Sequence, residues 1–120
     1  MPAIKTKRVW DPHDAGDGAR FLVDGRWPPG ARHDSLRVVL WVREAAPGFK
    51  LMKWFGGRAD RWSEFRTKYF AELDDDPNGW EPIAHQARLG PVTLIYASKN
   101  RQHNNAVALA DYLSRAVGSD

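Results

Sequence analysis

The sequence contains no cysteine, which excludes disulfide scaffolds, cysteine nucleophiles and cysteine-ligated zinc sites. No apolar run approaches the ~20 residues that a membrane-spanning helix needs. Residues 1–10 lack the apolar stretch of a signal peptide. Charge of one sign is also scarce, because 18 Lys and Arg face 15 Asp and Glu, for a formal charge of +3. We therefore expect a soluble cytoplasmic protein with no membrane partner.

The chain does have the means to fold. Its 120 residues match the commonest domain size, and 42% of them are hydrophobic. Six tryptophans supply large apolar side chains, which excludes disorder as the general state. We expect one domain over residues 1–120, and the sequence makes no prediction of the oligomeric state.

Three segments have strand character: residues 4–10 alternate loosely, and residues 21–23 and 92–97 are continuous apolar runs. Apolar residues recur at helical spacing in 106–117. Helical segments fill the space between the second and third strands, as in crossovers between parallel strands. The pattern predicts a small single α/β domain with a three- or four-stranded, mostly parallel sheet and helices packed on its faces.

The middle of the chain is predicted to be helical. Residues 49–55 form a short helix, and Asp60 caps a longer one whose apolar stripe runs from Trp62 to Leu73. Pro82 suits the first turn of another short helix. Residues 34–46 fit a helix capped by Asp34 or Ser35, although the β-branched pair Val38-Val39 leaves a strand open.

Polar residues follow two of the predicted strands. Asp24 and Arg26 come after the run at 21–23, and Lys99 and Arg101 come after the strand through Ala97. Ligands of open α/β sheets bind beyond the carboxyl ends of the strands. The second cluster also opens a helix, whose free amides and dipole favour an anion. A phosphate, a carboxylate or a similar anionic small molecule is the expected ligand.

Seven residues are candidates for this site. Asp24 and His103 are the candidate acid–base pair. The candidate ligand-binding residues are Arg26, Trp27, Lys99, Asn104 and Asn105. Structural roles stand beside these: Asn104 or Asn100 caps the helix, His103 bonds a backbone carbonyl, and Asp24 pairs with Arg26.

Other chemistry finds no support in the sequence. The four histidines show no i, i+4 pairing, no serine lies in a nucleophile elbow, and no phosphate-binding glycine loop occurs. We therefore predict no metal and no cofactor.

The two candidate segments also carry a resemblance, as do motifs elsewhere in the chain. Residues 21–30, FLVDGRWPPG, resemble the LVDRLWPRG signature of the YeaO-like bacterial family, which has no established activity. The likeness continues through 40–43, 46–47, 53–56, 61–62, 65–73, 90–97 and 103–106. It covers nearly the whole chain and implies a compact cytoplasmic α/β domain. The family's motif positions fall on Asp24, Trp27, Pro28, Gly30, Trp41, Lys53, Trp54, Phe55, Tyr96, His103, Asn104 and Asn105.

This chain departs from the family pattern at three positions. Gly25 and Pro29 stand where the family has arginines, and Val39 stands where it has an acid. If those groups form a charge network in the family, the network in this chain has fewer charged residues.

Three functions remain open at this level. The favoured one is an anionic-ligand or enzymatic site at the strand ends. The second is a nucleic-acid-associated module, which draws on Lys5, Lys7, Arg8, Arg26, Lys99 and Arg101. The third is a structural or partner-binding domain with exposed aromatics such as Trp10 or Trp80.

Overall fold

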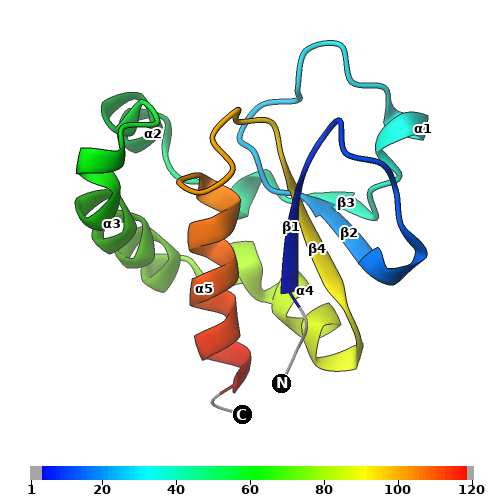
Figure 1. Cartoon of the computed structure of the whole chain (residues 1–120). Helices are drawn as coiled ribbons and strands as arrows, with labels where there is room; N and C mark the ends of the chain where they lie inside the picture. Colours follow the sequence, from blue (N-terminus) through cyan, green and yellow to red (C-terminus); the bar gives the residue numbers. More distant parts are fainter. Residues whose placement is uncertain (1–3, 119–120) are drawn as a thin grey trace.

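The computed structural model describes residues 4–118, and for His33 and Ser35 it describes the backbone alone. Its centre is a four-stranded sheet with the strand order β1-β4-β2-β3 and parallel pairing throughout. Figure 1 shows β4 between β1 and β2. The strands are β1 (Ile4–Arg8), β2 (Ala19–Leu22), β3 (Leu40–Trp41) and β4 (Val92–Tyr96). The predicted α/β class and its parallel sheet are confirmed.

Helices account for most of the remaining chain (Figure 1). The helices are α1 (His33–Leu36), α2 (Phe49–Phe55), α3 (Trp62–Asp75), α4 (Pro77–Leu89) and α5 (Asn105–Gly118). Short 3-10 turns are η1 (Ala15–Asp17), η2 (Arg43–Ala45) and η3 (Ala59–Arg61). None of the helices within residues 4–118 has the length and apolarity to cross a membrane.

The sheet separates two apolar cores because successive strand residues point to opposite faces. Phe21 and Leu94 pack in the larger core with the buried residues of α2 to α5. Leu22 and Ile95 pack in the smaller core with Leu36 of α1. All five residues of β4 are buried, as expected for a central strand covered on both sides.

The connections after β2 and β4 leave the sheet toward opposite faces. These strands are neighbours, with Leu22 paired to Ile95. β2 continues to α1 on the smaller core, whereas β4 continues to α5 on the larger core. Divergent connections from neighbouring parallel strands create the topological switch point at which ligands of such sheets bind. The candidate residues follow these two strands.

The helix predicted over 34–46 is wrong, and the strand alternative holds in part. α1 ends at Leu36 because Arg37 takes a left-handed conformation with φ 50. The chain then forms the edge strand β3 and η2. The N-cap position of α1 is Arg32, so Asp34 and Ser35, predicted as caps, lie inside the helix.

Two predicted helix starts differ from the observed ones. Asp60 lies in η3, and α3 begins at Trp62 without a side-chain cap. The helix around Pro82 begins at Pro77, so Pro82 lies inside α4 rather than in its first turn.

A buried aspartate stabilises the side of the sheet that carries the smaller core. The Asp17 carboxylate is 0% exposed and forms ion pairs with Lys5 at 3.1 Å, Lys7 at 2.9 Å and Arg20 at 2.5 Å. Arg20 also donates to the Leu36 carbonyl oxygen, which ties β2 to α1. Burial alone raises the pKa of Asp17, but hydrogen bonds led by that from Lys7 hold it well below its usual range.

Candidate functional site

Asp24 bridges the switch point between β2 and β4. Its Oδ2 accepts a hydrogen bond from the Ala97 amide at 3.0 Å, and its Oδ1 accepts one from the Asn105 side-chain amide at 3.1 Å. The Trp41 indole donates to the Asp24 carbonyl oxygen at 2.7 Å. One residue thereby joins the ends of two strands to the start of α5 and to β3. The predicted partner Arg26 forms no hydrogen bond or ion pair with it within the described residues; the Asp24 oxygens accept from Ala97 and Asn105 instead.

Asp24 is largely buried, and burial raises the pKa of its carboxyl. The hydrogen bonds from Asn105 and Ala97 oppose that shift but do not cancel it. A raised pKa is typical of catalytic acids, and it is equally the result of placing a structural carboxylate beneath a loop. The structural role fits the observed bonds, because both oxygens already have partners within the fold.

The turn before α5 is built by asparagines. Asn104 caps the helix: its Oδ1 accepts from the Val107 amide at 2.9 Å, and its Nδ2 donates to the Asn100 carbonyl oxygen. Asn100 Oδ1 accepts from the amides of Gln102 and His103 at 3.0 and 2.9 Å. The amides that a bound anion would need are thus partly taken by side chains of the turn itself.

Asn105 belongs to the same framework. Its side-chain amide donates to the Val23 carbonyl oxygen at 3.0 Å as well as to Asp24. Asn105 is 3% exposed, so its side chain is buried within this framework.

His103 packs on α3 rather than on Asp24. Its ring lies 5.0 Å from the Trp62 ring, centroid to centroid, and the side chain is half-buried. Within residues 4–118, no hydrogen bond joins His103 to Asp24. The structure therefore brings Asp24 and Asn105 into contact and leaves the predicted acid–base pair unconnected.

Arg26 and Lys99 occupy the exposed part of the candidate site. Neither side chain forms a hydrogen bond or an ion pair within the described part of the chain. Trp27 is half-buried in the smaller core, where its indole donates to the Ala31 carbonyl oxygen and its ring meets Trp41 edge-on at 5.5 Å. Trp27 therefore supports the loop that carries Arg26.

Four of the six cations assigned to nucleic acid are engaged within the fold. Lys5 and Lys7 bind Asp17, and Arg8 donates to the carbonyl oxygen of Ser98 at 2.9 Å. Arg101 forms a two-bond pair with Asp11, whose pKa it lowers to about 2. Arg26 and Lys99 are the remaining members of that set.

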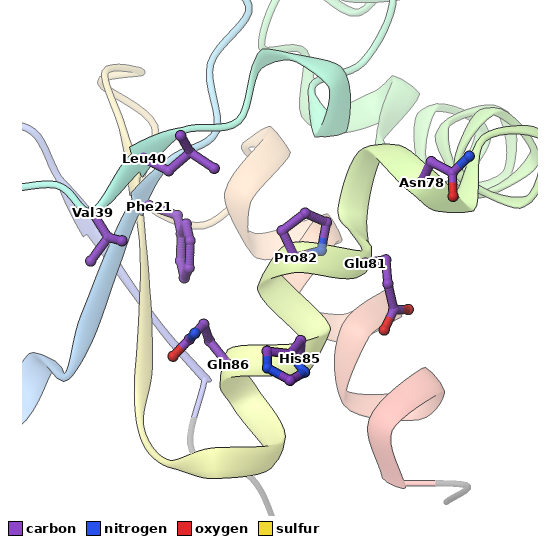
Figure 2. A pocket seen from close by; sticks show the side chains of 8 residues that line it. All are labelled: Phe21, Val39, Leu40, Asn78, Glu81, Pro82, His85 and Gln86. Atoms are coloured by element: carbon purple, nitrogen blue, oxygen red, sulfur yellow. The ribbon is translucent and has the colours of Figure 1, made fainter.

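The sequence did not predict a groove that lies on the side of the sheet that carries the larger core. Figure 2 shows Phe21, Val39 and Leu40 on one side of the groove, opposite α4, which contributes Asn78, Glu81, Pro82, His85 and Gln86. The groove holds about 520 Å³. Its sequence signal was the apolar pair Val39-Leu40, which the helix prediction concealed; these residues are 65% and 49% exposed. No group of three His, Asp or Glu side chains that could hold a metal occurs within 4–118.

Comparison with known proteins identifies the family to which this chain belongs. A family model described as "Inactive DUF488-N3 subclade" matches residues 3–120. This chain belongs to the DUF488-N3i family. It is 39% identical over 110 residues to "Uncharacterized protein YeaO" of Escherichia coli (strain K12), covering 92% of this chain and 96% of that relative. It is 32% identical over 114 residues to "Uncharacterized protein Rv3073c" of Mycobacterium tuberculosis (strain ATCC 25618 / H37Rv), covering 92% and 93%. No solved structure matches significantly.

Within this DUF488-N3i chain, the departures from the YeaO-like pattern lie on the surface. Gly25, Pro29 and Val39 are all exposed. Asp24, Asn104 and Asn105, which match the pattern, connect β2, β4 and α5. These three matching residues therefore lie in the framework, whereas the three departures lie at the surface.

Proposed function

We propose that this protein is a non-catalytic domain that binds a small anionic ligand at the carboxyl edge between β2 and β4. Arg26 and Lys99 supply the positive charge in this proposal. The observation that carries it is the position of these exposed cations beyond two neighbouring parallel strands whose connections diverge. Within the described residues Asp24 forms no ion pair with either cation; its carboxylate oxygens accept from the Ala97 amide and from Asn105.

The bonds and packing of Asp24 and His103 argue against an acid–base reaction at this edge. A general base must lie within hydrogen-bonding reach of the proton it takes, and its orienting partner must touch it. Asp24 faces Ala97 and Asn105, and His103 packs on Trp62. The description of the family as inactive supports the same conclusion.

Thermal unfolding with inorganic phosphate, citrate or adenosine monophosphate tests the proposal. A ligand that binds only the folded state stabilises that state by RT ln(1 + [L]/Kd), so the unfolding midpoint rises with ligand concentration. We expect at least one of these anions to raise the midpoint of the unmodified protein. We expect the rise to vanish in the double variant Arg26→Ala/Lys99→Ala.

The matched control is Arg88→Ala/Arg115→Ala, which removes the same charge from exposed positions on α4 and α5. The control should keep the full rise. An equal reduction of the rise in both double variants would show a response to net charge alone and would refute the site, as would the absence of any rise.

A further inference from the structure

Positive charge is concentrated in one stretch of the chain. Residues 49–68 contain six Lys and Arg against Asp60 and Glu64, so their formal charge of +4 exceeds the +3 of the whole chain. Residues 72–81 follow with five acids and no base. The small net charge therefore conceals a strongly uneven distribution. The basic stretch forms α2, η3 and the first half of α3, which lie together in Figure 1.

Trp54 lies at the centre of this basic region. The Arg61 guanidinium carbon lies 5.0 Å from the centroid of the Trp54 ring, and Lys68 Nζ lies 4.6 Å from it. Lys50 precedes Trp54 by one helical turn and shares its side of α2. We call this region the Trp54 surface; it consists of Phe49, Lys50, Lys53, Trp54, Arg61 and Lys68.

Two of these cations are available to an external partner. Lys68 forms an ion pair with Glu64 at 2.9 Å, and Arg61 donates to the Trp54 carbonyl oxygen. Lys50 and Lys53 are exposed and form no hydrogen bond or ion pair within residues 4–118. Phe49 lies beside them at the first position of α2, 74% exposed. An exposed aromatic ring next to two lysines is not needed by the core.

We propose that the Trp54 surface binds single-stranded nucleic acid, with Lys50 and Lys53 on phosphates and Phe49 stacked on an unpaired base. Proteins that bind single strands combine a basic track with aromatic rings that stack on bases. A membrane fits less well, because the buried residues of α2, Leu51 and Phe55, already belong to the protein core. This surface is separate from the anion site proposed between β2 and β4. It also differs from the set of cations to which the sequence assigned nucleic-acid binding, most of which are bonded within the fold.

Fluorescence anisotropy of a labelled single-stranded oligothymidylate tests this assignment. We expect Lys50→Ala/Lys53→Ala to weaken binding and to lower the log–log salt slope by about 0.7 for each phosphate that the variant no longer neutralises. We expect Phe49→Ala to weaken binding about fivefold or more, because one base then has no aromatic ring to stack on. Heparin, a polyanion without bases, should bind Phe49→Ala as well as it binds the unmodified protein.

The controls match each change elsewhere on the molecule. Arg88→Ala/Arg115→Ala removes the same charge from α4 and α5, and Leu89→Ala removes an apolar side chain that is 71% exposed. Both controls and Arg26→Ala/Lys99→Ala should bind the oligonucleotide normally, which keeps this test separate from that of the small-anion site. No effect of Lys50→Ala/Lys53→Ala, or no binding at all, would overturn the proposal. An unchanged affinity in Phe49→Ala would assign the surface to polyanions in general and overturn the nucleic-acid assignment.

Discussion

The Asp24 carboxylate accepts a hydrogen bond from the side-chain amide of Asn105, 81 residues further along the chain, at 3.1 Å. Asn105 also donates to the Val23 carbonyl oxygen, and Asp24 accepts from the Ala97 amide. Together these bonds close the switch point between β2, β4 and α5. Two residues that sequence alone assigned to binding and catalysis therefore hold the edge of the sheet together.

Asp24→Ala should destabilise the fold. The change leaves the Ala97 amide without its acceptor and removes one acceptor of Asn105, and an unsatisfied buried donor costs about 1–3 kcal/mol. Asp24→Asn should cost less, because an amide oxygen can still accept from Ala97. Urea unfolding measures both values, and a stability equal to that of the unmodified protein in Asp24→Ala would contradict the bridging role.

The pH dependence of Asp24→Asn follows from the raised pKa of Asp24. A raised folded-state pKa gives a stability contribution that is full below the unfolded pKa and is lost as pH rises through the folded pKa. The stability difference between the unmodified protein and Asp24→Asn should therefore be smaller at about pH 7 than at about pH 4. Paired urea titrations at these two pH values measure it, and the opposite trend would show that the Asp24 pKa is not raised.

Asp17→Asn should be among the most damaging single changes. It removes the counter-ion of Arg20, which is 2% exposed, and breaking a buried ion pair costs about 3–5 kcal/mol. Because the pKa of Asp17 is lowered on folding, its contribution is present above the unfolded pKa and is lost as pH falls. The difference from the unmodified protein should shrink below about pH 4.

Asp60→Asn is the matched control for Asp17→Asn. It neutralises an exposed aspartate paired with Arg58 and should change stability only slightly. Calorimetric unfolding of both variants provides the comparison, and equal losses of stability would mean that burial of Asp17 does not decide its contribution.

His103→Ala should lower the unfolding midpoint. The imidazole packs on Trp62, and an aromatic pair contributes about 0.5–1.5 kcal/mol beyond its burial. His103→Phe keeps a ring against Trp62 and should recover most of the lost stability. If His103→Ala had an unchanged or higher midpoint, His103 would be a binding residue maintained at the expense of stability.

Gly18→Ala should disrupt the junction before β2. Gly18 has φ 66, and an added Cβ would lie 2.1 Å from the Pro91 carbonyl oxygen, which accepts from the Ala19 amide. The left-handed backbone and this clash should together cost more than about 2 kcal/mol. Gly57→Ala is the control, since it has φ 74 but no atom within 4 Å. Similar losses of stability in both variants would show that backbone strain acts alone.

The sequence predicted the elements whose apolar pattern is strong and local. β4 and α5 lie where continuous burial and helical spacing place them, at Val92–Tyr96 and Asn105–Gly118. Residues 34–46 could not be predicted in this way, because their structure depends on one left-handed residue, Arg37, and on pairing with β2. The start of the helix around Pro82 was also not predicted. Proline is typical of the first turn of a helix, but this helix begins at Pro77 and contains Pro82 in its interior.

The structure brings the predicted residues Asp24 and Asn105 into contact, and the roles of the site residues in binding or catalysis stay predictions. Chain order and the parallel topology suffice to place Asp24 and Asn105 at one edge, and capping chemistry suffices for Asn104. Whether Asp24 meets His103 or Asn105 depends on how α5 docks on the sheet, which no local pattern records. The burial of Asp17 was missed for the same reason, since its three cations come from β1 and β2.

Residue-resolved NMR titration with adenosine monophosphate tests the central claim most directly. If the protein is a non-catalytic domain that binds anions between β2 and β4, the amides of Gly25, Arg26 and Lys99 should shift in a saturable way. The ligand should also be recovered chemically unchanged. Saturable shifts confined to other regions, no shifts at all, or conversion of the ligand would contradict the account.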